Sequence, residues 1–130
     1  MDNCKVAAIQ MATGPNVSAN LLKVEQLVEE AVQNNAGLVV LPENFAYMGK
    51  CEKDSWAIKE REGDGPLQDF MSHLASKHGI WIVGGTVPIE ACDASKIHAS
   101  CFIYNDRGEQ VARYDKIHLY DVNIIETNEI

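Results

Sequence analysis

The spacing of hydrophobic residues along the chain separates strand-like runs from helix-like ones. A mostly apolar run, Lys5 to Met11, stops at the turn-forming residues Thr13 to Asn16 and predicts a buried strand. Asn16 or Ser18 is placed to cap a helix that follows. The apolar residues of this helix recur at helical spacing, and Gly37 is expected to end it: Leu21, Val24, Leu27, Val28, Ala31 and Val32.

A second apolar run, Leu38 to Leu41, predicts another short buried strand. Pro42 lacks a backbone N–H, so it cannot continue a strand ladder, and the chain is expected to enter a loop at Glu43. A strand, a helix and a strand in this order favour a right-handed crossover between two parallel strands.

The rest of the chain continues the α/β pattern. A helix is possible over Asp54 to Glu62, and Pro66 begins another helix that Gly79 ends. The apolar stripe of this later helix is formed by Leu67, Phe70, Met71, Leu74 and Ala75. A third strand runs over Ile80 to Val87, and its paired glycines indicate that another backbone packs closely there. Two further strands flank a turn at Asn105 to Gly108 and predict a hairpin, Ile97 to Tyr104 and Glu109 to Tyr114. With no repeat or linker, residues 1–130 are expected to form one α/β domain.

Composition and charge indicate which kinds of binding partner and which cellular compartment to expect. The chain has 130 residues, of which 46% are hydrophobic and 23% charged, as expected of a globular domain. Its net charge is −8 and no basic stripe occurs, which argues against nucleic acid and against an anionic membrane as partners. No apolar run is long enough to span a bilayer and the N-terminus lacks the order of a signal peptide, so we expect a cytoplasmic protein.

The cysteines and histidines do not form a recognised metal or disulfide pattern. The four cysteines lack the C-x-x-C spacing, so reduced thiols are expected: Cys4, Cys51, Cys92 and Cys101. Cys92, His98, Cys101 and His118 do not have the spacing of a zinc site either. The sequence therefore predicts neither a metal nor a cofactor.

Two charged residues follow predicted strands directly. Glu43 comes after the second strand and Lys116 comes after the last one. In α/β proteins, ligand-binding groups gather at strand ends, where a carboxylate can act as a general base and a lysine can stabilise an oxyanion. Taken singly, each residue is more often a solvated charge or a member of an ion pair.

Three segments together give a more specific signal. They are Leu41–Phe45 (LPENF), Gly79–Pro88 (GIWIVGGTVP) and Arg113–Val122 (RYDKIHLYDV). In order and content they resemble the carbon–nitrogen hydrolase (nitrilase) superfamily, and within it the amidase branch that contains deaminated-glutathione amidase and omega-amidase. The resemblance implies a four-layer αββα sandwich of which residues 1–130 form the N-terminal half.

The resemblance also implies a Glu-Lys-Cys triad that hydrolyses amides. Glu43 matches the general base and Lys116 matches the lysine that stabilises negative charge, whereas the nucleophilic cysteine should follow the lysine. Residues 117–130 contain no cysteine. We therefore expect a domain truncated before its nucleophile and inactive by itself, with the second half of the core and a homo-oligomer interface supplied by the full-length protein.

Other candidates for the site are weaker. Cys101 is expected to be a small core residue, and Cys51 is expected to be a loop thiol without a role in catalysis. Neither is therefore expected to replace the nucleophile. Tyr47 and His118 are the candidate substrate-binding residues. Tyr47 could line the substrate pocket and His118 could brace the lysine segment, although packing and structural roles are the commoner alternatives. The family also has a second glutamate beyond the lysine, and neither Glu126 nor Glu129 can be matched to it.

Two other functions fit the same residues. The chain could be a complete small α/β module that binds a ligand or regulates without catalysis, with Glu43 and Lys116 recognising the ligand. It could also be an interaction protein that covers a full-length paralogue through an open sheet. In every case the acidic composition offers no positive patch for a dicarboxylate substrate, so a local cation would have to bind it.

Overall fold

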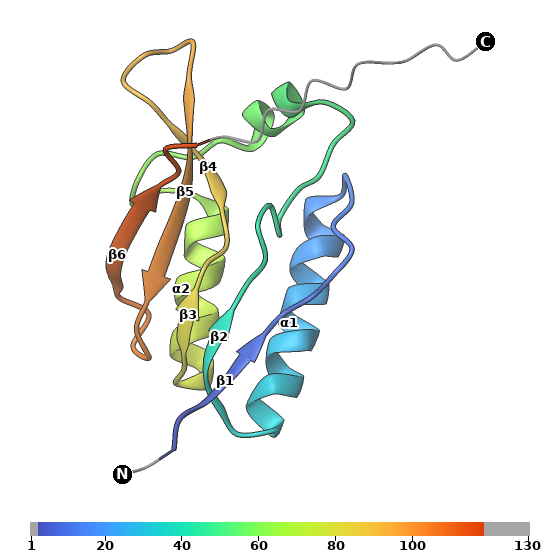
Figure 1. Cartoon of the computed structure of the whole chain (residues 1–130), viewed down its shortest axis with the longest axis vertical. Coiled ribbons are helices and arrows are strands. Elements are labelled where there is room, and N and C mark those ends of the chain that lie inside the picture. The colour runs from blue at the N-terminus through green and yellow to red at the C-terminus, as the bar shows by residue number, and fades with distance from the viewer. Residues whose placement is uncertain (1–2, 119–130) are drawn as a thin grey trace, which may run out of the picture.

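The computed structural model describes residues 3–118, which form one sheet and a layer of helices (Figure 1). The elements occur in the order β1 (Lys5–Ala8), α1 (Val17–Gln33), β2 (Ala36–Val40), the 3-10 helix η1 (Glu52–Ile58), α2 (Pro66–His78), β3 (Trp81–Val83), β4 (Val87–Glu90), β5 (Ile97–Tyr104) and β6 (Gln110–Asp115). Within residues 3–118, no helix combines the length and the apolar character that crossing a membrane requires.

The sheet is mixed, with a parallel part and an antiparallel part. β1, β2 and β3 are parallel neighbours, so the predicted parallel pair joined by a helix is confirmed. β3 and β4 both pair antiparallel with β5, β3 near its end and β4 near its start. β6 pairs antiparallel with the opposite edge of β5, which gives the predicted hairpin.

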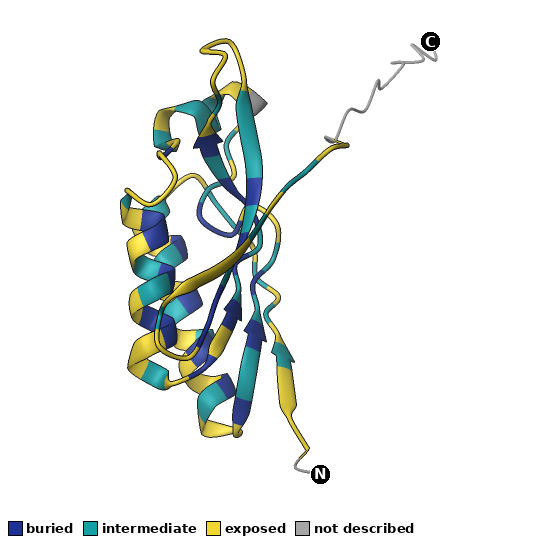
Figure 2. Ribbon diagram, turned by 90° about the vertical axis from the view of Figure 1, so that its left-hand side faces the viewer, coloured by how far each residue is buried: buried dark blue, intermediate teal, exposed yellow. Residues whose placement is uncertain are grey.

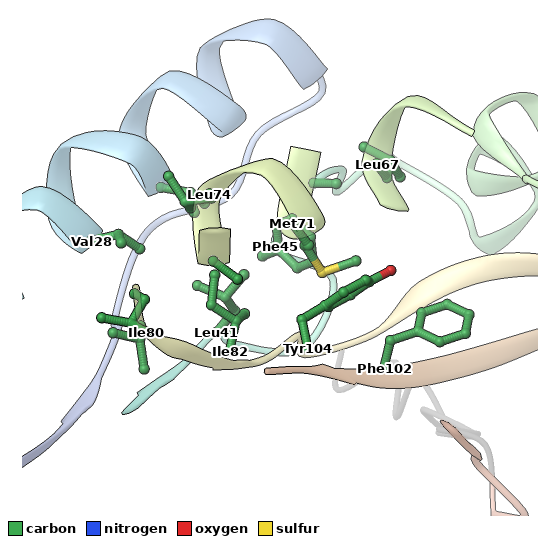
Figure 3. Close-up of a cluster of buried hydrophobic side chains, with 14 of the residues drawn as sticks. Val28, Leu41, Phe45, Leu67, Met71, Leu74, Ile80, Ile82, Phe102 and Tyr104 are labelled. Atoms are coloured by element: carbon green, nitrogen blue, oxygen red, sulfur yellow. The ribbon is translucent and has the colours of Figure 1, made fainter. Parts of the chain in front are cut away.

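Both α-helices cover the same face of the sheet, and their apolar stripes form the core against it (Figure 3). Val24 and Val28 of α1 and Met71 of α2 are fully buried against strand residues such as Ile82 and Phe102. Burial of a side chain of this size contributes about 1.5–3 kcal/mol. The helical spacing read from the sequence therefore identifies the buried face of each helix.

The opposite face of the sheet is not covered by any element among residues 3–118 (Figure 2). Val6, Leu38 and Trp81 are register partners in adjacent strands and point to this face. Val6 is 57% exposed and Trp81 is 39% exposed. The expectation that the first strand is buried is therefore wrong, because β1 lies at the edge of the sheet and has helices on only one of its faces.

The start of α1 agrees with its predicted cap, but its end does not. Asn16 caps the helix by accepting a hydrogen bond from the N–H of Ala19 at 3.0 Å. At the other end Asn35, not Gly37, adopts the left-handed conformation, with φ of 67°. Asparagine tolerates this conformation, so the chain turns two residues early and Gly37 becomes part of β2.

Two further predictions differ in detail, and a third is confirmed. The possible helix over Asp54 to Glu62 is the shorter 3-10 helix η1, and the third strand is interrupted between β3 and β4. The interruption lies at Gly84–Thr86, where Gly85 has φ of 55°. The paired glycines do mark a close approach of backbone, as expected, since a Cβ atom on Gly85 would overlap the carbonyl oxygen of Pro42.

The limits of α2 and the hairpin turn follow the sequence closely. Pro66 is the first helical residue of α2 and Gly79 ends it in the left-handed conformation, with φ of 61°. In the hairpin turn, the side chain of Asn105 accepts hydrogen bonds from the N–H groups of Arg107 and Glu109, each at 3.0 Å, and Gly108 has φ of 79°. These are the local signals that turn formation requires.

Candidate active site

Glu43 lies just beyond the end of β2, where the neighbouring strand still holds the backbone. The N–H of Leu41 donates to the carbonyl of Val83 at 2.9 Å, which extends the β2–β3 pairing past Val40. Pro42 then ends the ladder, and its carbonyl packs against Gly85, a position with no room for a side chain. The side chain of Glu43 is 55% exposed.

The residue after Glu43 sets the direction in which the chain leaves the strand. Asn44 has φ of 52°, a conformation that asparagine adopts more readily than most residues. Its N–H donates to Thr86 Oγ1 at 3.0 Å, and the Thr86 hydroxyl donates to Asn44 Oδ1 at 3.3 Å. Thr86 lies in the interruption between β3 and β4, so this interruption fixes the loop that carries Glu43.

A buried asparagine in α1 holds the following part of the same loop. Asn20 is only 5% exposed and interrupts the apolar stripe of the helix. Its amide nitrogen donates to the carbonyls of Gly14 at 2.8 Å and Ala46 at 2.9 Å, and its oxygen accepts from the N–H of Gly14 at 3.1 Å. Sequence reasoning missed this residue, although a polar side chain at a stripe position is a recognisable signal.

Lys116 follows the last strand and reaches the loop after β2. Its N–H donates to the carbonyl of Ala99 on β5 at 2.9 Å, one residue beyond the end of β6. Its Nζ forms an ion pair with Oε1 of Glu43, 73 residues earlier in the sequence. The lysine side chain is 26% exposed. The two predicted residues of the site are thus brought together by the order of strands in the sheet.

The residue before Lys116 is held by several charged and polar groups. Asp115 Oδ1 accepts hydrogen bonds from Ser100 Oγ at 2.6 Å and from Arg113 Nε at 2.8 Å. Partial burial raises the pKa of the Asp115 carboxyl, but the hydrogen bonds from Arg113 and Ser100 outweigh it, and the pKa lies below its ordinary value. Asp115 is therefore an anionic anchor at the end of β6.

The weaker candidates do not join this ion pair. Tyr47 is half-buried, and its hydroxyl lies beside Gly49, close to the carboxylate of Asp54. His118 is exposed. No hydrogen bond or ion pair in the described part of the chain connects either residue to Glu43 or Lys116, so their predicted roles in substrate binding stay predictions. Glu126 and Glu129 lie outside the described residues.

None of the four cysteines is bonded to Glu43 or Lys116 within residues 3–118. Cys4, Cys51 and Cys92 are exposed, and Cys101 is partly buried. A hydrogen bond to Asp54, reinforced by the charge of that carboxylate, raises the pKa of the Cys51 thiol. Burial raises the pKa of Cys101. Both effects favour the protonated thiol, which is a poor nucleophile.

Two hollows among residues 3–118 lie away from the ion pair, and no candidate metal site occurs among the same residues. A hollow of about 280 Å³ opens between η1 and the starts of α1 and α2, and another of about 190 Å³ lies beside α2 and Tyr104. Neither is lined by Glu43, Tyr47 or Lys116. Within the same residues, no group of three or more His, Cys, Asp or Glu side chains could hold a metal ion.

Sequence comparison places this arrangement in a family. The model of the carbon–nitrogen hydrolase family matches residues 5–129. The chain is 34% identical over 125 residues to a deaminated glutathione amidase of Yersinia enterocolitica, in a match that covers 95% of this chain and 43% of that protein. It is 36% identical over 126 residues to an omega-amidase of Saccharomyces cerevisiae, covering 92% of this chain and 43% of that protein.

Solved structures support the same conclusion. The crystal structure of Saccharomyces cerevisiae Nit3, a member of branch 10 of the nitrilase superfamily, matches 88% of this chain and 44% of its own, with a TM-score of 0.78 and 29% identity. The chain spans less than half the length of these relatives. The predicted α/β fold of the nitrilase type is thus confirmed. Because the family model matches nearly all of the sequence, the chain belongs to the carbon–nitrogen hydrolase family.

Proposed function

We propose that the full-length protein containing this chain hydrolyses linear amides to ammonia and a carboxylate through a Glu-Lys-Cys triad. In this proposal Glu43 is the general base and Lys116 stabilises negative charge on the substrate oxygen. The observation that carries it is the Glu43–Lys116 ion pair, which joins two strand ends in a member of a family of carbon–nitrogen hydrolases.

The chemistry needs both groups beside a thiol. An ordinary cysteine has a pKa of about 8.5 and is mostly protonated at neutral pH, so a base must take its proton. The Glu43 carboxylate takes that proton as the sulfur attacks the amide carbon, and the Lys116 ammonium stabilises the oxyanion that forms. The proton passes to the leaving nitrogen, ammonia departs, and an acyl thioester remains.

The second half of the reaction reuses the same base. Glu43 takes a proton from water as the water oxygen attacks the thioester carbon. The intermediate collapses, the C–S bond breaks, and the proton returns to sulfur, which releases the carboxylic acid and restores the thiol. The Lys116 ammonium faces the same developing oxyanion in both halves, so its contribution is made in each transition state.

The proposal assigns the nucleophile to a part of the full-length protein outside these 130 residues. The surroundings of Cys51 and Cys101 raise the pKa values of their thiols, and none of the four cysteines is hydrogen-bonded to Glu43 or Lys116 in the described part of the chain. By this mechanism the 130-residue chain alone releases no ammonia.

The substrate class that we propose is a short amide that also carries a carboxylate. The two relatives compared above are named for deaminated glutathione and for omega-amides. Since the net charge of the chain is −8, recognition of the substrate carboxylate requires a specific cation in the pocket rather than a general positive surface.

The test is ammonia release from a dicarboxylic acid monoamide by the full-length protein and its variants. Glu43→Gln and Lys116→Met should each lower kcat/KM by at least about a hundredfold, because each removes a group that acts in the transition state. Glu90→Gln is the matched control, since Glu90 also forms an ion pair with an exposed cation, Arg61, at 3.2 Å. Glu43→Gln with unchanged kcat/KM would refute the proposal, and binding without ammonia release would favour the ligand-binding module.

A further inference from the structure

Asp115, the last residue of β6, stands at the centre of a network of charged and polar side chains. Its carboxylate accepts hydrogen bonds from the Ser100 hydroxyl at 2.6 Å and from two guanidinium nitrogens of Arg113 at 2.8 and 3.3 Å. His98 Nδ1 lies 3.8 Å from Asp115 Oδ2. Ser100 lies on β5 and is fully buried. The hydroxyl that binds the carboxylate is therefore fixed in the core.

Arg113 connects this network to a second element. Its guanidinium pairs with Glu62 at 2.8 Å, in the loop that leads into α2, and lies 5.8 Å above the ring of Phe102. The side chain of Arg113 is only 21% exposed. A partly buried guanidinium with two carboxylate partners and an aromatic face is a rigid support. The end of β6 is therefore tied both to β5 and to the start of the second helix.

Lys116 needs such a support because of its place in the sheet. β6 is an edge strand, and Lys116 comes after its last residue, with a single backbone hydrogen bond to Ala99. The next residues, Ile117 and His118, are exposed. Edge-strand ends open easily when nothing else holds them. Glu43, by contrast, comes from β2, on the far side of β3 and β5, so the two charges meet only if the end of β6 stays in place.

We propose that Asp115 is a positioning residue that holds the Lys116 ammonium against Glu43 through its bonds to Ser100 and Arg113. The inference rests on the proposed role of Lys116 and adds the residue that keeps this lysine in register. Asp115 acts from the opposite side of the strand and does not touch the substrate. A purely structural role would stabilise the hairpin without changing the environment of the lysine.

The experiment follows the lysine itself in the full-length protein. Lysine labelled with ¹³C at the ε carbon gives one NMR signal per residue, and Lys116→Arg assigns the signal of Lys116. That signal should stand apart from those of exposed lysines and move when Glu43 is replaced in Glu43→Gln. In Asp115→Asn it should move to the position of the exposed lysines. Asp106→Asn, the same change at an exposed residue of the hairpin turn, is the control and should leave it in place.

Kinetics supply a second readout. Asp115→Asn should lower kcat for amide hydrolysis by about 10- to 100-fold with KM nearly unchanged. A misplaced Lys116 ammonium stabilises the transition state less, whereas binding of the substrate changes little. Ser100→Ala removes one hydrogen bond to Asp115 and is the variant to use if Asp115→Asn does not fold. It should change the Lys116 signal and kcat in the same direction.

The outcomes separate the two ideas. If Glu43→Gln moves the Lys116 signal while folded Asp115→Asn and Ser100→Ala proteins leave both that signal and kcat unchanged, the positioning role is overturned and the proposed function stands. If Glu43→Gln also leaves the signal unchanged, the ion pair is absent in solution, and both the proposed function and the positioning role are overturned.

Discussion

Single residues decide whether Glu43 is presented at the end of β2. Gly85 is the clearest case, because its backbone has a positive φ and a side chain there would overlap the carbonyl of Pro42. Asn44 and Thr86 then bond to each other across the same gap. The position of Glu43 thus depends on Gly85, Asn44 and Thr86, none of which takes part in the proposed reaction.

Replacing Gly85 by alanine tests this dependence. We expect Gly85→Ala to lower the free energy of unfolding of the full-length protein by about 2 kcal/mol or more, because it combines a strained φ with a backbone overlap. Amide hydrolysis should fall beyond what the loss of folded protein explains. Chemical denaturation and the rate per folded molecule measure the two effects.

Gly14→Ala provides the comparison, since nothing lies within 4 Å of a Cβ atom placed there. Its effect should be within about 0.5 kcal/mol, as for most surface substitutions. A Gly85→Ala protein as stable and as active as the Gly14→Ala protein would mean that the loop can move away from Gly85, and that the close approach does not position Glu43.

At the level of elements, a buried carboxylate organises the start of α2. Glu60 is only 6% exposed, and its oxygens accept hydrogen bonds from the N–H groups of Leu67 at 2.6 Å and Gln68 at 3.2 Å. A negative charge at a helix N-terminus is favourable, because the first N–H groups have no partner inside the helix. The backbone of Glu60 also bonds to Pro88 and Glu90, so the same residue links α2 to β4.

Removing this carboxylate should loosen the helix from its first turn. We expect Glu60→Ala to cost about 2–3 kcal/mol, since it leaves buried N–H groups without an acceptor. Hydrogen exchange should speed up first at the amides of Leu67 and Gln68. Glu29→Ala, on the exposed face of α1, should leave both quantities nearly unchanged. Unchanged protection of those two amides would show that the cap is dispensable.

At the scale of the whole molecule, the main feature is the difference between the two faces of the sheet. One face is covered by α1 and α2, and no element among residues 3–118 covers the other (Figure 2). Val6 and Trp81 lie on this face, and Tyr114 is 56% exposed on β6. The four-layer fold expected from the resemblance would place a second sheet there in the full-length protein.

This arrangement predicts unequal effects of a charge at two equally exposed positions. Val6 is 57% exposed on the open face and Leu22 is 56% exposed on α1. If a second sheet covers the open face, Val6→Asp should destabilise the full-length protein by about 2–3 kcal/mol more than Leu22→Asp, because it buries an unpaired charge. Denaturant unfolding of both variants gives the difference. Equal and small losses of unfolding free energy in the two variants would show that the open face is exposed to solvent in the full-length protein.

Much of the fold could be read from local patterns. The apolar stripes of α1 and α2, the cap at Asn16, the stop at Gly79 and the turn before Gly108 each depend on residues a few positions apart, where short-range propensities dominate. The errors have two sources. At the end of α1 two local signals compete, and Asn35 adopts the left-handed turn expected at Gly37. In β1 the apolar residues alone predict burial, whereas the exposure of the strand depends on what packs on each face of the sheet.

The sequence by itself determined most of the elements, the family to which the chain belongs, and the two charged residues that follow strands. Only the tertiary structure decided that these two residues form an ion pair. Glu43 and Lys116 are 73 residues apart, and they meet because β3 and β5 place the ends of β2 and β6 at the same region of the sheet. Asn20 of α1 bonds to the carbonyl of Ala46, and Asp115 bonds to Ser100 on β5, also across distant parts of the sequence. Such contacts are set by pairing between distant strands, whose energy no window of neighbouring residues contains.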